Sequence, residues 1–223
     1  MITVHHLENS RSQRVLWLLE ELGVPYEVKS YARDKKTMLA PPELRTIHSL
    51  GKSPVISDGE VIIAESGAIV EFLVERYGAG RLLPTAGTPE RRRYTYWLHY
   101  AEGSLMPPIV LKLIFVRIPK APMAFFLRPV VRGIAAKVLT TFVEPQLAQH
   151  AKYLEDELTK TAWFAGDELT AADIQMSFPL EVMASQTGLT GKAPHIEAFL
   201  AKIHARPAYQ RALSRGGPYS FQS

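Results

Sequence analysis

The hydrophobic pattern of this chain changes near residue 80, and this change limits the folds available to it. Before that point, short β-rich runs alternate with helical patterns. The strand-like runs are residues 2–4, 26–31, 54–57 and 61–64. After it, apolar residues recur with helical periodicity and strand alternation is missing from the sequence. We therefore expect an α/β domain over residues 1–80, joined to an all-helical domain over residues 88–223.

The order of elements in the first 80 residues predicts a mixed sheet. A strand, a helix over residues 15–22 and a second strand form a βαβ unit, whose two strands run parallel. The turn Asp58-Gly59 then joins two strands into an antiparallel hairpin, and a helix begins at Ser66. Residues 78–88 hold three glycines and one proline, so we expect them to form the linker.

The absence of cysteine restricts the chemistry of the chain. Such a protein forms no disulfide, has no thiolate metal ligand and lacks a cysteine nucleophile. Any thiol chemistry must therefore use a thiol that a ligand carries. Hydrophobic residues make up 47% and charged residues 22%, a mixture typical of soluble globular proteins. Because neither a signal peptide nor a run of about 18 apolar residues is visible, we expect a cytoplasmic protein.

Positive charge is concentrated in one segment of the second half. The net charge is −2 over residues 1–80 and +6 over residues 81–223. Residues 103–143 contain no acidic residue and six basic ones: Lys112, Arg117, Lys120, Arg128, Arg132 and Lys137. These charges lie among Leu, Ile, Val and Phe at helical spacing, so we expect no nucleic-acid partner. A flank around a site for small anions and a membrane-surface contact both fit this mixture.

Small polar residues mark the change from the first strand to the first helix, in the stretch NSRSQRVLW. Ser10 and Gln13 have the spacing of a capping box, so Ser10 is a candidate N-cap. A helix N-terminus also attracts anions, and a hydroxyl there can donate a hydrogen bond to a sulfur anion. Asn9 or Ser12 would then supply the cap. Both roles of Ser10 stay open at this point.

Two further stretches place polar groups at the ends of predicted strands. In LGKSPVI, a cis bond at Ser53-Pro54 would leave the backbone of Val55 free to pair with an extended peptide ligand. In AESGAI, Glu65 and Ser66 begin a helix whose N-terminus can hold a carboxylate, while Glu65 takes an ammonium group. An N-cap beside a surface acid is the alternative interpretation.

Taken in order, these motifs resemble those of a known family. The stretches NSRSQRVLWLLEELGVPYE, LGKSPVI and AESGAIVEFL are similar to the thioredoxin-like N-terminal domain of cytosolic glutathione S-transferases. The stretches HYAEGSLMPP, FAGDELTAADI and RPAYQRAL are similar to the helical domain of that family. The resemblance covers nearly the whole chain and points to a bacterial and fungal branch with a serine-type active site. It implies a homodimer that acts in detoxification with glutathione as co-substrate.

The resemblance also implies roles for individual residues. Ser10 matches the hydroxyl that hydrogen-bonds the glutathione sulfur, with Asn9 and Ser12 as further candidates. The glutathione-binding positions are Lys52, Ser53, Val55, Glu65, Ser66, His48 and Glu102. Among them, Glu65 and Ser66 match the pair that binds the γ-glutamyl end, and Glu102 would reach the glutathione of the neighbouring subunit.

A pocket for an apolar electrophile is expected between the two domains. Its candidates, each of which is also a candidate core residue, are Leu105, Met106, Ile109 and Phe115. Thr170 and Asp173 have capping-box spacing, and we assign them to folding.

The histidines do not show the spacing of metal ligands, so we expect no metal site. His5 and His6 are adjacent on a strand and therefore point to opposite faces. We interpret both as structural residues, one of which borders the thiol site.

The sequence therefore predicts an enzyme that ionises the glutathione thiol and transfers it to apolar electrophiles. Glutathione-dependent peroxidase or disulfide reductase activity is an alternative, because it would use the same activated sulfur. A non-catalytic binding module of the same fold is a third hypothesis, which the presence of Ser10, Glu65 and Ser66 together disfavours.

Overall fold

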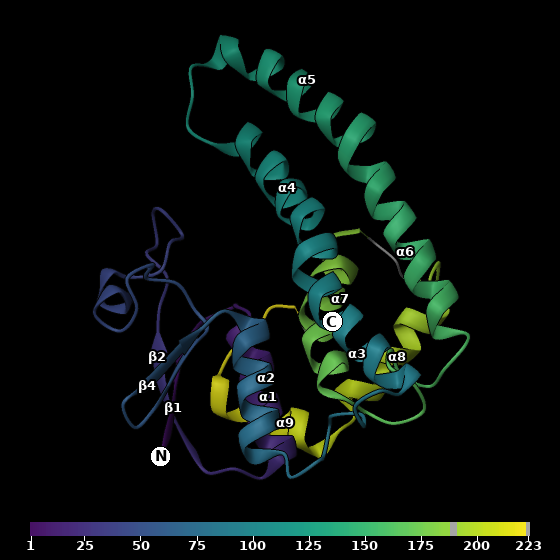
Figure 1. Ribbon diagram of the computed structural model, residues 1–223. Coiled ribbons are helices and arrows are strands. Elements are labelled where there is room, and N and C mark those ends of the chain that lie inside the picture. The colour runs from purple at the N-terminus through teal and green to yellow at the C-terminus, as the bar shows by residue number, and fades with distance from the viewer. Residues whose placement is uncertain (188–190, 222–223) are drawn as a thin grey trace.

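The computed structural model describes residues 1–187 and 191–221, and it contains a sheet-based half followed by a helical half (Figure 1). The sheet has four strands in the order β2-β1-β3-β4. β1 (Ile2–Leu7) runs parallel to β2 (Tyr26–Tyr31) and antiparallel to β3 (Val55–Asp58), which pairs in turn with β4 (Val61–Ala64). The prediction of a thioredoxin-like mixed sheet is therefore confirmed.

β1 is longer than the strand predicted at residues 2–4. Its parallel register continues through His5, His6 and Leu7, which pair with the last three residues of β2. The two histidines interrupt the apolar run in the sequence, but both side chains are buried and hydrogen-bonded. Satisfied hydrogen bonds allow these polar rings to lie inside the protein, and so the strand continues through them.

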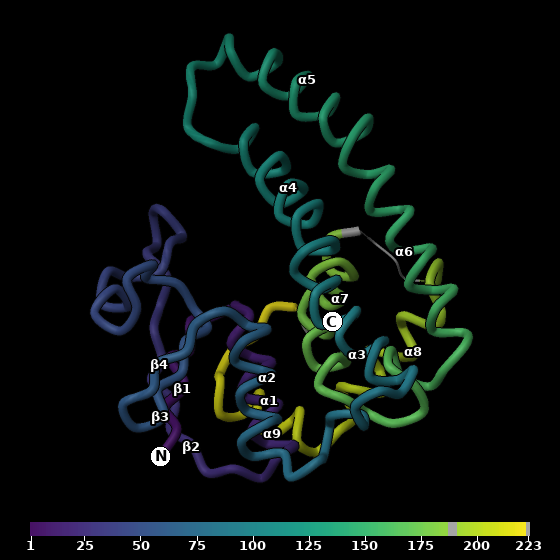
Figure 2. Tube along the Cα trace, in the orientation of Figure 1, coloured from purple at the N-terminus to yellow at the C-terminus, as the bar shows by residue number. Residues whose placement is uncertain are grey.

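Two helices of the first half pack on the sheet. α1 (Ser12–Leu22) and α2 (Ser66–Tyr77) contact each other and lie between the strands and the helical half, as Figures 1 and 2 show. α1 ends at Gly23, whose φ of 66° is the left-handed conformation that glycine adopts without a steric penalty. A short 3-10 helix, η1 (Pro42–Thr46), precedes β3.

The second half is helical, and several of its helices begin with a proline, whose fixed φ suits the first helical position. Its long helices are α3 (Pro89–Tyr100), α4 (Met106–Arg117), α5 (Arg128–Val138), α6 (Glu144–Leu158), α7 (Ala171–Thr187), α8 (Pro194–His204) and α9 (Pro207–Gly216). Two short 3-10 helices, η3 (Ile118–Lys120) and η4 (Phe125–Leu127), connect α4 to α5. Two π-helical turns, η2 (Ala101–Leu105) and η5 (Leu139–Val143), join α3 to α4 and α5 to α6 without a break.

The core joins the two halves through α7, which packs against α1, α2, α3 and α8. Its apolar side chains Ile174, Met176 and Leu180 are fully buried. α9 returns to the first half and packs along α1. The two halves therefore share one continuous hydrophobic core, and their relative position is set by packing.

The α4–α5 arm, residues 106–143, projects away from this core (Figures 1 and 2). Large apolar side chains are exposed along it: Val110, Ile114, Ile118, Phe125, Phe126, Leu127, Val130, Ile134 and Phe142. The six basic residues predicted to form a positive segment lie on the same arm. Among the described residues, none of the helices combines the length and hydropathy needed to cross a membrane.

Asp173 holds the start of α7 against the preceding loop. Its carboxylate accepts hydrogen bonds from the N–H groups of Thr170 and Phe164, both at 2.8 Å, and from the Thr170 hydroxyl at 2.9 Å. This is the acidic half of the predicted capping box. Burial raises the pKa of Asp173 to about 6, while these hydrogen bonds act in the opposite direction.

Replacing Asp173 by alanine is expected to lower the free energy of unfolding by about 3 kcal/mol, because buried donors lose their acceptor. Urea unfolding followed by circular dichroism measures this change. Asp167→Ala removes an exposed carboxylate six residues earlier, and it should change stability by less than about 0.5 kcal/mol. Equal effects of the two substitutions would show that the Asp173 hydrogen bonds do not stabilise the fold.

Candidate active site

Three adjoining cavities lie where the first half meets the helical half. We name them after one residue each: the Glu65 cavity of about 200 Å³, the Ser10 cavity of about 390 Å³ and the Met106 cavity of about 420 Å³. Arg11 lines all three, and Lys52 and Ser53 line the first two. The cavities therefore form one continuous cleft.

Ser10 lies between the end of β1 and the start of α1, and it lines the Ser10 cavity. Its Oγ accepts a hydrogen bond from the Ser12 N–H at 3.2 Å and lies 2.8 Å from the Ser12 Oγ. The predicted capping box does not form, because Gln13 N–H donates to the Ser10 carbonyl and not to its side chain. The Ser10 hydroxyl thus supports the first turn of α1 and borders the cavity at the same time.

Asn9 and Ser12, the other two candidates for contact with a sulfur, are held in different ways. Asn9 lines the cleft with φ at 48°, but its Oδ1 accepts a hydrogen bond from the Ser220 N–H at 2.7 Å. Ser12 is fully buried behind Ser10 and lines none of the three cavities. Its Oγ lies 2.8 Å from the Nδ1 of His6. Of the three residues, Ser10 has the hydroxyl placed at the cavity wall.

The loop before β3 brings further predicted residues to the cleft. The Ser53–Pro54 peptide bond is cis, and Ser53 lines both the Glu65 and the Ser10 cavities. Val55 instead lies inside the sheet, where it pairs with His5 on one side and Ala64 on the other. The structure therefore corrects the expectation for Val55: Ser53 borders the cavities instead, because β3 begins at Val55.

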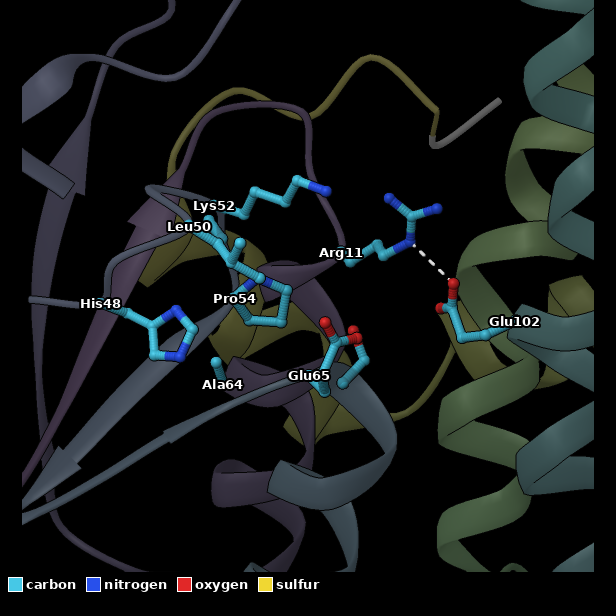
Figure 3. Close-up of a pocket in the computed structure, with 10 residues that line it drawn as sticks. Arg11, His48, Leu50, Lys52, Pro54, Ala64, Glu65 and Glu102 are labelled. Atoms are coloured by element: carbon cyan, nitrogen blue, oxygen red, sulfur yellow. Dashed lines mark hydrogen bonds and ion pairs between the residues drawn. The ribbon is translucent and has the colours of Figure 1, made fainter. Parts of the chain in front are cut away.

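The Glu65 cavity gathers the other predicted binding residues. Glu65 precedes the first residue of α2 with φ at 72°, an unfavourable conformation for a residue with a side chain, and both it and Ser66 line this cavity. His48 and Lys52 line the same cavity, and Figure 3 shows them across from Arg11.

Glu102 belongs to η2 and lies on the opposite wall from the sheet. Its carboxylate accepts a hydrogen bond from Arg11 Nε at 3.0 Å (Figure 3). It also forms an ion pair with the buried guanidinium of Arg14. Burial disfavours the ionised form of Glu102, but the charges of Arg14 and Arg11 outweigh it and lower its pKa. Glu102 thus lines a cavity of its own chain, and its contact with a neighbouring subunit stays a prediction.

The Ser10 cavity is rich in cationic side chains, one of which, Arg11, is paired with Glu102. Among the described residues its lining includes no carboxylate, and its four cations are Arg11, Arg33, Arg45 and Lys52. Clustered cations and the N-terminus of α1 favour an anion at this position. Sequence reasoning missed all of these except Lys52, although Arg11 stands beside Ser10 in the sequence.

The Met106 cavity has an apolar wall that differs from the prediction. Met106 lines it as expected, together with Val110, Leu113, Phe178 and Val182. Leu105 and Ile109 are buried in the core, and neither they nor Phe115 line this cavity. Met106, Val110 and Leu113 have the i, i+4, i+7 spacing of one face of α4, and Ile109 lies on the face that packs into the core.

Within residues 1–187 and 191–221, the structure contains no group of three or more His, Asp or Glu side chains placed to hold a metal ion. The cleft is therefore described by its hydroxyl, its cations and its apolar wall.

Comparison with known proteins identifies the family. Residues 1–75 match the model of the glutathione S-transferase N-terminal domain, and residues 123–207 match that of the C-terminal domain. The chain is 35% identical to glutathione S-transferase 3 of Schizosaccharomyces pombe over 218 residues, which cover 96% of this chain and 88% of that protein. It is 34% identical to glutathione S-transferase 1 of Saccharomyces cerevisiae over 82% of this chain and 80% of that one.

Solved structures agree with this result. A glutathione S-transferase from Actinobacillus pleuropneumoniae superposes with a TM-score of 0.79 at 31% identity, over 99% of this chain and 95% of that one. A glutathione transferase from Phanerochaete chrysosporium, solved with oxidized glutathione, shares the fold with a TM-score of 0.77 at 19% identity, over 96% of this chain and 94% of that one. The chain belongs to the cytosolic glutathione S-transferase family, and its activity is that of a glutathione S-transferase.

Glu102→Gln is expected to lower the free energy of unfolding by about 3 kcal/mol at neutral pH, because it leaves the buried Arg14 without a counter-charge. Since the pKa of Glu102 is lowered in the folded state, its stabilisation is present above the unfolded pKa of about 4.3 and is lost as pH falls through the folded pKa. Urea unfolding of both proteins between pH 7 and about pH 3 should therefore show a difference that shrinks in acid.

The matched control is Asp156→Asn, which breaks the exposed ion pair with Lys152 and should change stability by less than about 1 kcal/mol. A stability difference between Glu102→Gln and the unmodified protein that does not vary with pH would contradict the ionic role of Glu102.

Proposed function

We propose that the cleft binds glutathione with its sulfur at Ser10 and conjugates it to an apolar electrophile held in the Met106 cavity. One observation carries the proposal: a hydroxyl at the N-terminus of α1 borders a cavity lined by four cations, and this cavity adjoins one with an apolar wall. The Ser10 cavity thus suits a sulfur anion, and the adjoining Met106 cavity suits an uncharged electrophile.

The two ends of glutathione are assigned to the Glu65 cavity and the loop before β3. The N-terminus of α2 at Ser66 suits the γ-glutamyl carboxylate, and Glu65 suits the ammonium group beside it. Lys52 and His48 suit the glycine carboxylate, and the Ser53 backbone suits the central peptide groups. Glutathione itself is the co-substrate, so the chain needs no cysteine of its own.

Ionisation of the thiol is the main contribution of the protein to catalysis. A free thiol has a pKa of about 8.5, so little thiolate exists at neutral pH. Lowering that pKa by about 2 units requires roughly 2.7 kcal/mol of preference for the anion. A charge-assisted hydrogen bond from Ser10, the N-terminus of α1 and the cations of the Ser10 cavity supply free energy of this size. The thiolate then attacks the electrophile.

Ser10→Ala is expected to lower kcat at neutral pH at least about tenfold, because the sulfur loses a hydrogen-bond donor worth roughly 1.5–3 kcal/mol. The pKa read from the kcat profile should rise by about 1–2 units, with only a modest loss of glutathione affinity. Turnover of a chlorinated dinitrobenzene across a range of pH measures both quantities. Ser214→Ala, on the exposed face of α9, is the matched control and should leave the profile unchanged.

The Ser10 assignment fails if Asn9→Ala or Ser12→Ala lowers kcat and raises this pKa while Ser10→Ala does neither. Glutathione binding without turnover of any electrophile would favour a binding module of the same fold. Turnover of hydroperoxides or disulfides in preference to aryl halides would favour the peroxidase or reductase alternative.

We infer a homodimer from the exposed apolar side chains of the α4–α5 arm, since apolar patches of this kind mark interaction surfaces. Six basic residues on the same arm support the alternative prediction of a membrane-surface contact. A cytoplasmic location is compatible with both.

Light scattering is expected to give twice the 24.9 kDa of one chain in solution without lipid. A monomer at micromolar concentration would contradict the homodimer. Co-sedimentation with phosphatidylserine vesicles at low and high salt tests the second prediction, and failure to bind at low salt would exclude a membrane-surface contact through the arm.

A further inference from the structure

A buried hydrogen-bond chain leads away from Ser10 and ends at His6. The Ser10 Oγ lies 2.8 Å from the Ser12 Oγ, which lies 2.8 Å from the Nδ1 of His6. All three side chains are at most 5% exposed, so the contacts between them are shielded from solvent. These hydrogen bonds therefore connect the cavity wall to an ionisable side chain, His6, that lines none of the three cavities.

Each hydroxyl has one hydrogen, and this fixes the direction of both hydrogen bonds between Ser10 and His6. If Ser10 donates to a sulfur anion, Ser12 must donate to Ser10, because two oxygens at 2.8 Å need a hydrogen between them. The Ser12 Oγ then has only lone pairs for His6, so Nδ1 must carry a hydrogen. The donor state of Ser10 is thus coupled to the protonation of His6.

The surroundings of the His6 ring favour its neutral form. The Nδ1 of His6 faces Ser12, while the backbone carbonyl of Gly216 favours the protonated form of the ring. Burial lowers the pKa of His6, and the Gly216 carbonyl only partly offsets this. A neutral ring with its hydrogen on Nε2 leaves Nδ1 as an acceptor, so that Ser12 donates to His6 and Ser10 donates to Ser12.

Charged groups on the elements around His6 turn to other partners. On α1, Arg14 pairs with Glu102, and Glu20 pairs with Arg211 of α9. Glu21 pairs with Arg206, the residue before α9. On α9, Arg215 donates to the Tyr26 carbonyl, and on β2, Lys29 lies near His5. Across β1 and β2, Ser30 stands opposite His6 in the register. Ser12 is thus the polar side chain that couples His6 to the cleft.

We propose that His6 is the positioning residue of the thiol site: through Ser12 it receives the proton that leaves glutathione, and it then holds Ser10 as a donor to the sulfur. The S–H bond breaks and its proton passes to the Ser10 Oγ, Ser10 passes its own to the Ser12 Oγ, and Ser12 passes its own to the Nδ1 of His6. The products are a thiolate and an imidazolium, so no net charge enters the protein. When an aryl halide reacts, the halide leaves with its electron pair and the His6 proton returns to solvent.

This proposal rests on the proposed function. Its direct test counts the protons released to solvent when glutathione binds. Glutathione is mixed with the unmodified protein at neutral pH in weak buffer with an indicator dye, while the ultraviolet absorbance of the thiolate is recorded. Each thiolate formed should release well under half a proton to solvent, because the negative charge of the thiolate offsets the effect of burial and His6 retains the proton. Release of about one proton per thiolate would overturn the proposal, and this measurement needs no variant that must fold.

Two variants and a matched control locate the effect. Ser12→Ala and His6→Gln should each raise the pKa of the bound thiol by about one unit and lower kcat at neutral pH about tenfold. The KM for glutathione should stay within about twofold, and Ser12→Ala should release about one proton per thiolate. His5→Gln alters the neighbouring buried histidine, which faces Tyr31 and Ser57, and should leave thiol pKa and proton count unchanged.

The outcomes separate the two proposals. If the unmodified protein neither binds glutathione nor turns over an electrophile, the proposed function fails. If it does both but releases a full proton per thiolate, only the role of His6 fails. A loss of thermal stability in Ser12→Ala and His6→Gln with unchanged thiol pKa would show that both residues are merely structural.

Discussion

The structure depends on the burial of one charged side chain, Arg14, at the seam between the two halves. Its guanidinium donates to the Gln175 carbonyl of α7 at 2.6 Å and pairs with Glu102 of η2, so α1 is tied to two elements of the helical half. A buried charge is tolerated only with such partners. Because Arg14 lies one turn after Ser10, the same contacts set the distance between the Ser10 hydroxyl and the opposite wall of the cleft.

The contacts of Arg14 also position the charged and apolar surfaces of the cleft. Held at the seam, the first turn of α1 places the Ser10 hydroxyl and the positive end of the helix dipole beside a cavity whose charged side chains are cationic. Phe178 and Met106 close the adjoining side with apolar surface, where the dielectric is low and electrostatic stabilisation of an anion is strong. Cationic side chains and an apolar wall thus lie next to each other within a single cleft, as thiol transfer to an apolar electrophile requires.

Local sequence predicted the features that depend on neighbouring residues. The strand and helix order of the first half follows from periodicity, and Ser10, Ser53, Glu65 and Ser66 line the cleft because they stand at element ends. What it missed depends on tertiary structure. Arg33 and Phe178 reach the cleft from distant parts of the chain, and the packing of α4 places Val110 at the cavity wall and Ile109 in the core. The sequence marks His5 and His6 as structural residues, one of which borders the thiol site, and only the fold brings the His6 ring to Ser12.

The central claim is that the cleft stabilises a sulfur anion, and titration of bound glutathione tests it most directly. The ultraviolet absorbance of the thiolate is followed against pH with the protein saturated. We expect a midpoint about 2 units below the value of about 8.5 for a free thiol. A midpoint equal to that of free glutathione, with the site demonstrably full, would contradict the account.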